Sequence, residues 1–199
     1  VWKYANDMSV SRTYFCGAVA GTKIYLFGGY DGKVIHRTAE VFDTETSTFS
    51  QYRPLPGHLS DCGAAVLGGY VYVAGGHDGM KNLSSVFRYN IHTTRRESVP
   101  SMSVARKNVQ LVELAGKLYA IGGQETKSVE MFSPDTGKWT KMADMDYQHW
   151  FASATAHDGR IYVISKAGFE MYLPGIDGVG AWTPLPAPAS LDGRTLVSV

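Results

Sequence analysis

Residues 23–29 read KIYLFGG, and the same pattern returns further along the chain as YVYVAGG and KLYAIGG. As a result, Gly28, Gly75 and Gly122 each open a glycine pair, and successive pairs lie 47 residues apart. A fourth copy, RIYVISK, follows after 43 residues and ends at Lys166 without the glycines. A repeat in the forties indicates either a propeller or a helical solenoid.

The residue types within each repeat favour strands over helices. The quoted runs are short, rich in β-branched and aromatic residues, and bounded by Gly and Asp turns. No segment shows a sustained apolar recurrence at i, i+3, i+4 and i+7. A strand of small residues precedes each run and two further strands follow it, so four strands form one repeat, as in a β-propeller blade. The expected innermost strands are GAVA (17–20), GAAVL (63–67), QLVEL (110–114) and SATA (153–156).

Large residues recur in pairs at fixed distances after each of these runs. The pairs are Phe42 and Phe49, Tyr89 and Arg96, Phe132 and Trp139, and Tyr172 and Trp182. Arg96 replaces an aromatic residue in the second repeat, and three inserted residues lengthen the interval in the fourth. Together with the glycine pairs, this pattern resembles the kelch family over essentially the whole chain. The resemblance implies an all-β kelch β-propeller.

The kelch resemblance also implies a domain organisation of four complete four-stranded blades between two partial ones. The complete blades are predicted at 9–55, 56–101, 102–144 and 145–187, the last of them divergent. Residues 1–8 match the outer strand of a preceding blade, and residues 188–199 match the inner strand of a following blade. Kelch propellers are closed rings of usually six blades, so we expect this chain to form part of a six-bladed ring.

The recurring aromatic residues have a structural explanation. Bulky rings fill the gap between neighbouring sheets of a propeller, and each contributes about 2–3 kcal/mol when buried. Two glycines at a strand end allow a positive φ and a close approach of the backbone. We therefore expect core positions, and no binding role, for Tyr25, Tyr72, Tyr119, Tyr162, Trp139 and Trp182.

The composition argues against several classes of function. Nineteen Lys and Arg balance eighteen Asp and Glu, for a formal net charge of +1, whereas nucleic acids and anionic membranes favour a clustered basic excess. Cys16 and Cys62 fit no zinc pattern and no disulfide framework, which weakly indicates a reducing compartment. The six histidines lack ligand spacing, and no Glu has an Asp four residues on, the start of the pattern used by iron-dependent kelch proteins. We expect a cytoplasmic, non-catalytic protein without metal or cofactor.

The loop that leads into each innermost strand contains the strongest candidate binding position. Equivalent copies of this position hold Arg12, Leu59, Arg106, His149 and Arg194. In the kelch adaptors that this chain resembles, the matching arginines line a shallow basin that grips acidic or polar segments, a task that suits the planar guanidinium. Alternatively, these side chains satisfy carbonyl groups or Glu side chains between blades. Further candidate contacts are Tyr30, His77, Tyr147 and Trp150, because aromatic residues dominate interface energetics.

The partner is expected to be another protein, and two classes remain open. The first is the substrate of a ubiquitin ligase, with this chain as the recognition domain of a BTB-kelch adaptor, the group that the loops MSVARKN and HDGMKNLSS resemble most. The second is actin, with this chain as a scruin-type actin-binding or actin-cross-linking kelch protein. A metal-dependent propeller enzyme is a remote third possibility.

Overall fold

The structure is a computed structural model that describes residues 5–175 and 178–186, and all its helix or strand structure there is β-strand. The strands are β1 (Cys16–Ala20), β2 (Lys23–Phe27), β3 (Ala39–Asp43), β4 (Thr48–Tyr52), β5 (Gly63–Leu67), β6 (Tyr70–Ala74), β7 (Val86–Asn90), β8 (Arg96–Val99), β9 (Gln110–Leu114), β10 (Lys117–Ile121), β11 (Val129–Ser133), β12 (Lys138–Lys141), β13 (Ser153–His157), β14 (Arg160–Ser165), β15 (Gly168–Leu173) and β16 (Ala181–Leu185). The strand predicted at 188–199, Arg194 and residues 1–4 lie outside the described residues.

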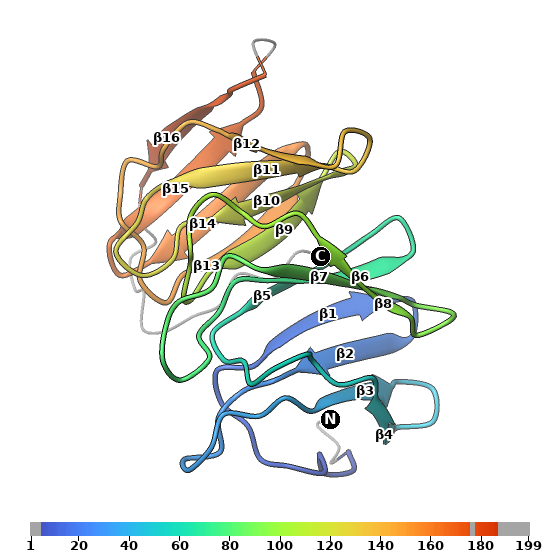
Figure 1. Cartoon of the computed structure of the whole chain (residues 1–199). Helices are drawn as coiled ribbons and strands as arrows, with labels where there is room; N and C mark the ends of the chain where they lie inside the picture. The colour runs from blue at the N-terminus through green and yellow to red at the C-terminus, as the bar shows by residue number, and fades with distance from the viewer. Residues whose placement is uncertain (1–4, 176–177, 187–199) are drawn as a thin grey trace.

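These strands form four antiparallel sheets of four strands, each paired in sequence order. We call the sheets blades 1 to 4, and Figure 1 shows them side by side, from β1–β4 at the bottom to β13–β16 at the upper left. The strands β1, β5, β9 and β13 pack against one another in this order along the inner edge. The prediction of an all-β propeller is therefore confirmed, and the four predicted innermost segments are the innermost strands.

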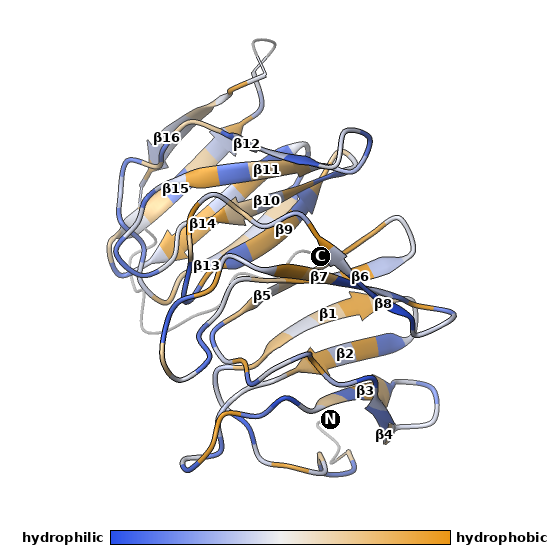
Figure 2. Ribbon diagram, viewed as in Figure 1, coloured by the Kyte–Doolittle hydropathy of each residue, from blue (hydrophilic) through white to orange (hydrophobic). Residues whose placement is uncertain are grey.

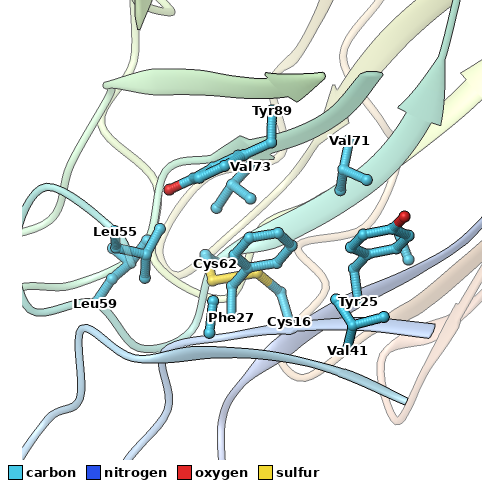
Figure 3. Packing of buried hydrophobic residues seen from close by; sticks show 12 residues of the cluster. Cys16, Tyr25, Phe27, Val41, Leu55, Leu59, Cys62, Val71, Val73 and Tyr89 are labelled. Atoms are coloured by element: carbon cyan, nitrogen blue, oxygen red, sulfur yellow. A yellow bond between two sulfur atoms is a disulfide. The ribbon is translucent and has the colours of Figure 1, made fainter. Parts of the chain in front are cut away.

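The hydrophobic core lies between neighbouring blades. Figure 3 shows the packing between blades 1 and 2, where Phe27 of β2 and Tyr89 of β7 are fully buried with ring centroids 5.0 Å apart. Equivalent clusters join blade 2 to blade 3 and blade 3 to blade 4. The outermost strands β8 and β12 are mainly hydrophilic (Figure 2). Each blade thus depends on its neighbour to cover its apolar face.

One recurring hydrogen bond ties the outermost strand of a blade to the preceding blade. The side-chain donors and carbonyl acceptors are Arg96 to Pro54 (2.8 Å), Trp139 to Pro100 (2.8 Å) and Trp182 to Ala143 (3.0 Å). Trp139 is half-buried and packs on Phe132 with ring centroids 5.2 Å apart, so its predicted role as a wedge between blades is confirmed. Arg96 keeps the hydrogen bond of the aromatic residue that it replaces.

A disulfide joins blades 1 and 2. Cys16 at the start of β1 and Cys62 just before β5 are bonded, with Cα atoms 5.5 Å apart, and both are buried. The indication of a reducing compartment, which rested on two cysteines without a disulfide pattern, therefore loses its basis. The two residues are 46 positions apart in the sequence, and only the packing of β1 against β5 brings them together.

Candidate functional site

The basic position in the entry loop is an internal anchor in blades 1, 3 and 4. In blade 3 the Arg106 side chain has no exposed surface. Its Nη1 donates to the carbonyl oxygens of Gly122 and Ser128, both at 2.7 Å, and its Nη2 donates to Glu130 Oε1 at 3.0 Å. The guanidinium therefore joins the end of β10 to β11 within one blade.

Blade 1 has the same Arg–Glu anchor, and blade 4 has a His–Glu pair at the same place. Arg12 is buried, and its Nη2 lies 2.6 Å from Glu40 Oε2. His149 is 2% exposed; its Nε2 lies 2.7 Å from Glu170 Oε1 and its Nδ1 lies 2.7 Å from Ser165 Oγ. Three blades thus pair a basic residue in the entry loop with a glutamate on the third strand.

The prediction that Arg12, Arg106 and His149 face a partner is wrong, because a side chain without exposed surface contacts none. Their shared position was identified correctly, but the side chains point into the blade and satisfy carbonyl groups and a glutamate. The sequence left open the alternative that these side chains satisfy carbonyl groups or Glu side chains between blades. The structure shows such contacts, but they lie within one blade. The matching glutamates at 40, 130 and 170 were the sequence signal for this arrangement.

The anchor glutamates also fix the backbone of the entry loops. Glu130 accepts hydrogen bonds from the backbone N–H groups of Ser103 at 2.7 Å and Val104 at 3.1 Å. Burial alone raises the pKa of Glu130, but the hydrogen bonds from Ser103 and Arg106, together with the Arg106 charge, outweigh it and hold the pKa below its ordinary value. The carboxylate is therefore ionised at neutral pH and positions both ends of the loop.

The glycine pair of one blade lies directly against the anchor residue of the next. Gly75 and Gly76 have φ values of +62° and +99°. The Gly76 N–H donates to the Arg106 carbonyl oxygen at 2.7 Å, and a Cβ on Gly75 would lie 2.7 Å from the same oxygen. The predicted positive φ and close backbone approach are confirmed, and they place successive entry loops on one side of the arc, at the left in Figure 1.

Two residues after the anchor position, one residue in each of blades 1 to 4 has a left-handed backbone conformation. The residues are Tyr14 (φ +53°), Asp61 (+57°), Asn108 (+56°) and Phe151 (+47°). The Asp61 N–H donates to the Tyr14 carbonyl oxygen at 2.7 Å, and the Asn108 N–H donates to the Asp61 carbonyl oxygen at 2.9 Å. This chain of hydrogen bonds passes from blade to blade, and all four side chains line one cavity of about 410 Å³, which we call the basin.

Three of the predicted contact residues line the basin. Tyr30 and His77 directly follow the glycine pairs and pair with the entry loops through single β-bridges, and Trp150 directly follows the anchor His149. Tyr147 is outside the basin lining; it is 38% exposed, and its ring packs against Gly168 and the ring of His149. The loop residues therefore predicted three of the side chains that line the basin.

Exposed aromatic rings form one part of the basin, and polar side chains form another. Phe151, Tyr14 and Trp150 are 67%, 55% and 50% exposed, and the rings of Tyr14 and Phe151 lie 6.5 Å apart although they belong to blades 1 and 4. The buried Asp61 accepts a hydrogen bond from Ser60 Oγ at 2.8 Å and another from the Asn108 side-chain amide, and Lys107 Nζ lies 3.9 Å from it. The buried anchors add no exposed cation, so the expected preference for an acidic partner loses its main support.

The sequence was compared with models of known protein families. The kelch motif model matches residues 11–56, 58–103 and 105–146, which together are more than half of the chain. The chain belongs to the kelch family. A solved structure titled "Structure of YjhT" has a TM-score of 0.79 and 16% sequence identity, with coverage of 96% of this chain and 69% of that chain. This likeness supports the propeller fold of the kelch domain.

Several curated kelch proteins are similar in sequence. Human Kelch-like protein 23 is 27% identical over 181 residues, which cover 88% of this chain and 32% of that protein. Human Kelch repeat and BTB domain-containing protein 8 is 31% identical over 134 residues, 59% of this chain and 22% of that protein. Spermatocyte protein spe-26 of Caenorhabditis elegans is 37% identical over 97 residues, 45% of this chain and 17% of that protein. The part that matches this chain thus spans about a third or less of the length of each of these relatives.

Sequence reasoning missed the four left-handed basin residues. A signal was present, because Asp61 and Asn108 occupy one position of the kelch repeat, and Asp and Asn are enriched at positive φ. Tyr14 and Phe151 gave no such signal in their own copies. Only the alignment of all four copies identifies a left-handed position that presents its side chain to the basin.

Within residues 5–175 and 178–186, no group of three or more His, Cys, Asp or Glu side chains is placed to hold a metal ion. The same part of the chain contains no helix long and apolar enough to cross a membrane.

Proposed function

We propose that this kelch domain is a non-catalytic protein-interaction module that recognises the substrate of a ubiquitin ligase as part of a BTB-kelch adaptor. The names of similar proteins support this assignment, since one of them combines kelch repeats with a BTB domain. The ring of six blades and a cytoplasmic location belong to the same proposal. The Cys16–Cys62 disulfide weighs against the location, because disulfides persist mainly in oxidising compartments.

The observation that carries the proposal is the exposure of large aromatic rings at positions that the scaffold does not require. The same backbone position holds Tyr14, Asp61, Asn108 and Phe151, so the fold accepts polar residues there. Tyr14 and Phe151 nevertheless leave more than half of their surface exposed, beside Trp150. Clusters of exposed Tyr, Trp and Phe are typical of protein interfaces. We assign the basin, including Tyr30 and His77, as the surface that holds the partner, with Tyr147 beside it.

The test replaces the two facing rings with the residue that blade 3 has at the same position. Tyr14→Asn with Phe151→Asn removes the aromatic surface and keeps a residue type that tolerates positive φ, as Asn108 does. The matched control is Leu173→Asn. Leu173 is 49% exposed and is the last residue of β15. Capture of the tagged full-length protein from cells, with mass spectrometry, should show partners that the double variant loses and the control keeps.

A second measurement distinguishes the adaptor role from actin binding. If the captured partners are ubiquitin-ligase substrates, their abundance rises when cells are depleted of this protein. Capture of actin at unchanged abundance would replace the adaptor role with actin binding. If the double variant melts like the wild type and keeps every partner, the basin is not the binding surface.

A further inference from the structure

Blade 2 lacks the polar anchor of the other three blades. Leu59 stands at the basic position, and Phe87 stands where the other blades have glutamate. Pro56 stands where Ser9 and Ser103 donate a backbone N–H to that glutamate, and proline has no N–H to donate. The cation, the carboxylate and one backbone donor have therefore been replaced together in a single blade.

A pocket of about 470 Å³ lies at this place in blade 2. Its apolar lining consists of Leu55, Pro56, Leu59, Met80, Leu83 and Phe87. Leu55 and Leu59 are buried in its wall, whereas Met80 is 92% exposed. Protein interiors are close-packed, so a replacement that served only to repack the blade would leave little space. The three exchanged residues instead border an open apolar hollow.

The pocket and the basin each share lining residues with a third hollow between them. A groove runs between the loops that follow the glycine pairs of blades 1 and 2. Tyr30 and Ile35 line both the basin and the groove, and His58 and Asp78 line both the groove and the pocket. A single extended segment can therefore occupy the basin and place a side chain in the pocket.

One carboxylate, that of Asp78, lines the pocket. Asp78 Oδ1 accepts the backbone N–H groups of Lys81 and Met80, both at 2.8 Å. These two hydrogen bonds, that of Lys81 first, hold the pKa of Asp78 below its ordinary value. No lysine or arginine is among the residues that line the pocket in the described part of the chain. Asp78 is therefore the carboxylate that lines the pocket, while the Lys81 charge, which also lowers the pKa of Asp78, and Lys33 of the adjoining groove lie at its edge.

We propose that the blade 2 pocket binds one aliphatic or aromatic side chain of the partner segment that occupies the basin, and that Asp78 favours a basic neighbour over an acidic one. Apolar burial supplies the attraction, and Coulomb repulsion disfavours a carboxylate at this place. The inference rests on the proposed function only for the identity of the segment. The pocket itself can be tested with defined small probes.

The test is an NMR titration in which capped dipeptides are added to the whole 199-residue chain. The leucine and methionine methyl groups of the protein are labelled with ¹³C. N-acetyl-Leu-Lys-amide should shift the methyl signals of Leu83 and Met80 in a saturable manner. N-acetyl-Leu-Glu-amide should bind more weakly, and N-acetyl-Ser-Lys-amide should leave these signals unchanged. If the Ser-Lys probe acts as well as the Leu-Lys probe, the apolar pocket is refuted. If the Leu-Glu and Leu-Lys probes bind equally, the role of Asp78 is refuted.

Two variants connect the shifts to the pocket. Leu59→Arg with Phe87→Glu introduces the anchor pair of blades 1 and 3 and should abolish the saturable shift of Leu83. Met80→Lys introduces the residue that blade 1 has at this position, Lys33, and cannot unfold the blade because the side chain is exposed. It should weaken binding of the Leu-Lys probe, and unchanged binding in both variants overturns the proposal. These titrations do not involve Tyr14 or Phe151, so failure here leaves the basin assignment standing, and the reverse also holds.

Discussion

Replacement of Arg106 by alanine should strongly destabilise the protein. The side chain has no exposed surface, and Glu130, its partner, is 2% exposed. Its removal leaves a buried carboxylate without a cation and leaves the carbonyl oxygens of Gly122 and Ser128 without this donor. Breaking a buried ion pair by removing one partner costs about 3–5 kcal/mol of unfolding free energy. We expect Arg106→Ala to fall in this range.

Two further variants test the reason for the loss. Lys107→Ala removes the neighbouring cation, whose side chain is 31% exposed and whose Nζ lies 3.9 Å from the buried Asp61. It should cost clearly less than Arg106→Ala, because Lys107 is partly in solvent and its contact is longer than a hydrogen bond. Arg106→Leu with Glu130→Phe introduces the apolar pair of blade 2. This double variant should be more stable than Arg106→Leu alone, because it leaves no buried unpaired charge. Its remaining deficit reflects the Ser103 and Val104 N–H groups, which lose their acceptor.

Urea unfolding followed by tryptophan fluorescence gives the free energy of unfolding of each variant. The reasoning is refuted if Arg106→Ala lies within about 1 kcal/mol of the wild type, which is the range of exposed positions. It is also refuted if the double variant is less stable than Arg106→Leu. Partner binding should decrease in step with stability in this series, because the anchor supports the loop that carries Asn108.

Two other predictions concern stability. In blades 1, 3 and 4, burial alone raises the pKa of the anchor glutamates, but hydrogen bonds and the basic partner outweigh it and hold the pKa below its ordinary value of 4.5. The ionised glutamates therefore stabilise the folded protein fully above about pH 4.5. This stabilisation is lost as the pH falls through the folded-state pKa. The thermal midpoint should decrease between pH 5 and pH 3, and a midpoint that rises on acidification contradicts this. Trp139→Ala should lower the free energy of unfolding by about 3 kcal/mol or more. Arg96→Ala loses one hydrogen bond to Pro54 and should lower it by about 1 kcal/mol. Equal losses in urea unfolding would contradict this order.

The architecture was accessible from the sequence because a propeller repeats its backbone requirements along the chain. A glycine pair recurs in blades 1 to 3, where the backbone turns at positive φ, as Gly75 and Gly76 do against Arg106. A large residue recurs on each outermost strand, where it contacts the preceding blade in blades 2 to 4, as Trp139 does. The disulfide was not accessible, because no repeat encodes it and the two cysteines occupy different positions of adjacent repeats.

The site was only partly accessible, because a repeat fixes where a residue lies in the fold and does not fix where its side chain points. Arg106 appeared to be a binding residue since arginines suit interfaces, and its burial becomes clear only when Glu130 on the third strand is considered with it. The same pairing makes the exception in blade 2 informative. Leu59 alone appears to be a simple loss of charge, but Leu59 with Phe87 and Pro56 is a coordinated exchange of a polar anchor for apolar surface. Comparison of whole groups of contacting positions between blades therefore separates residues that hold the scaffold from residues that are free to recognise a partner.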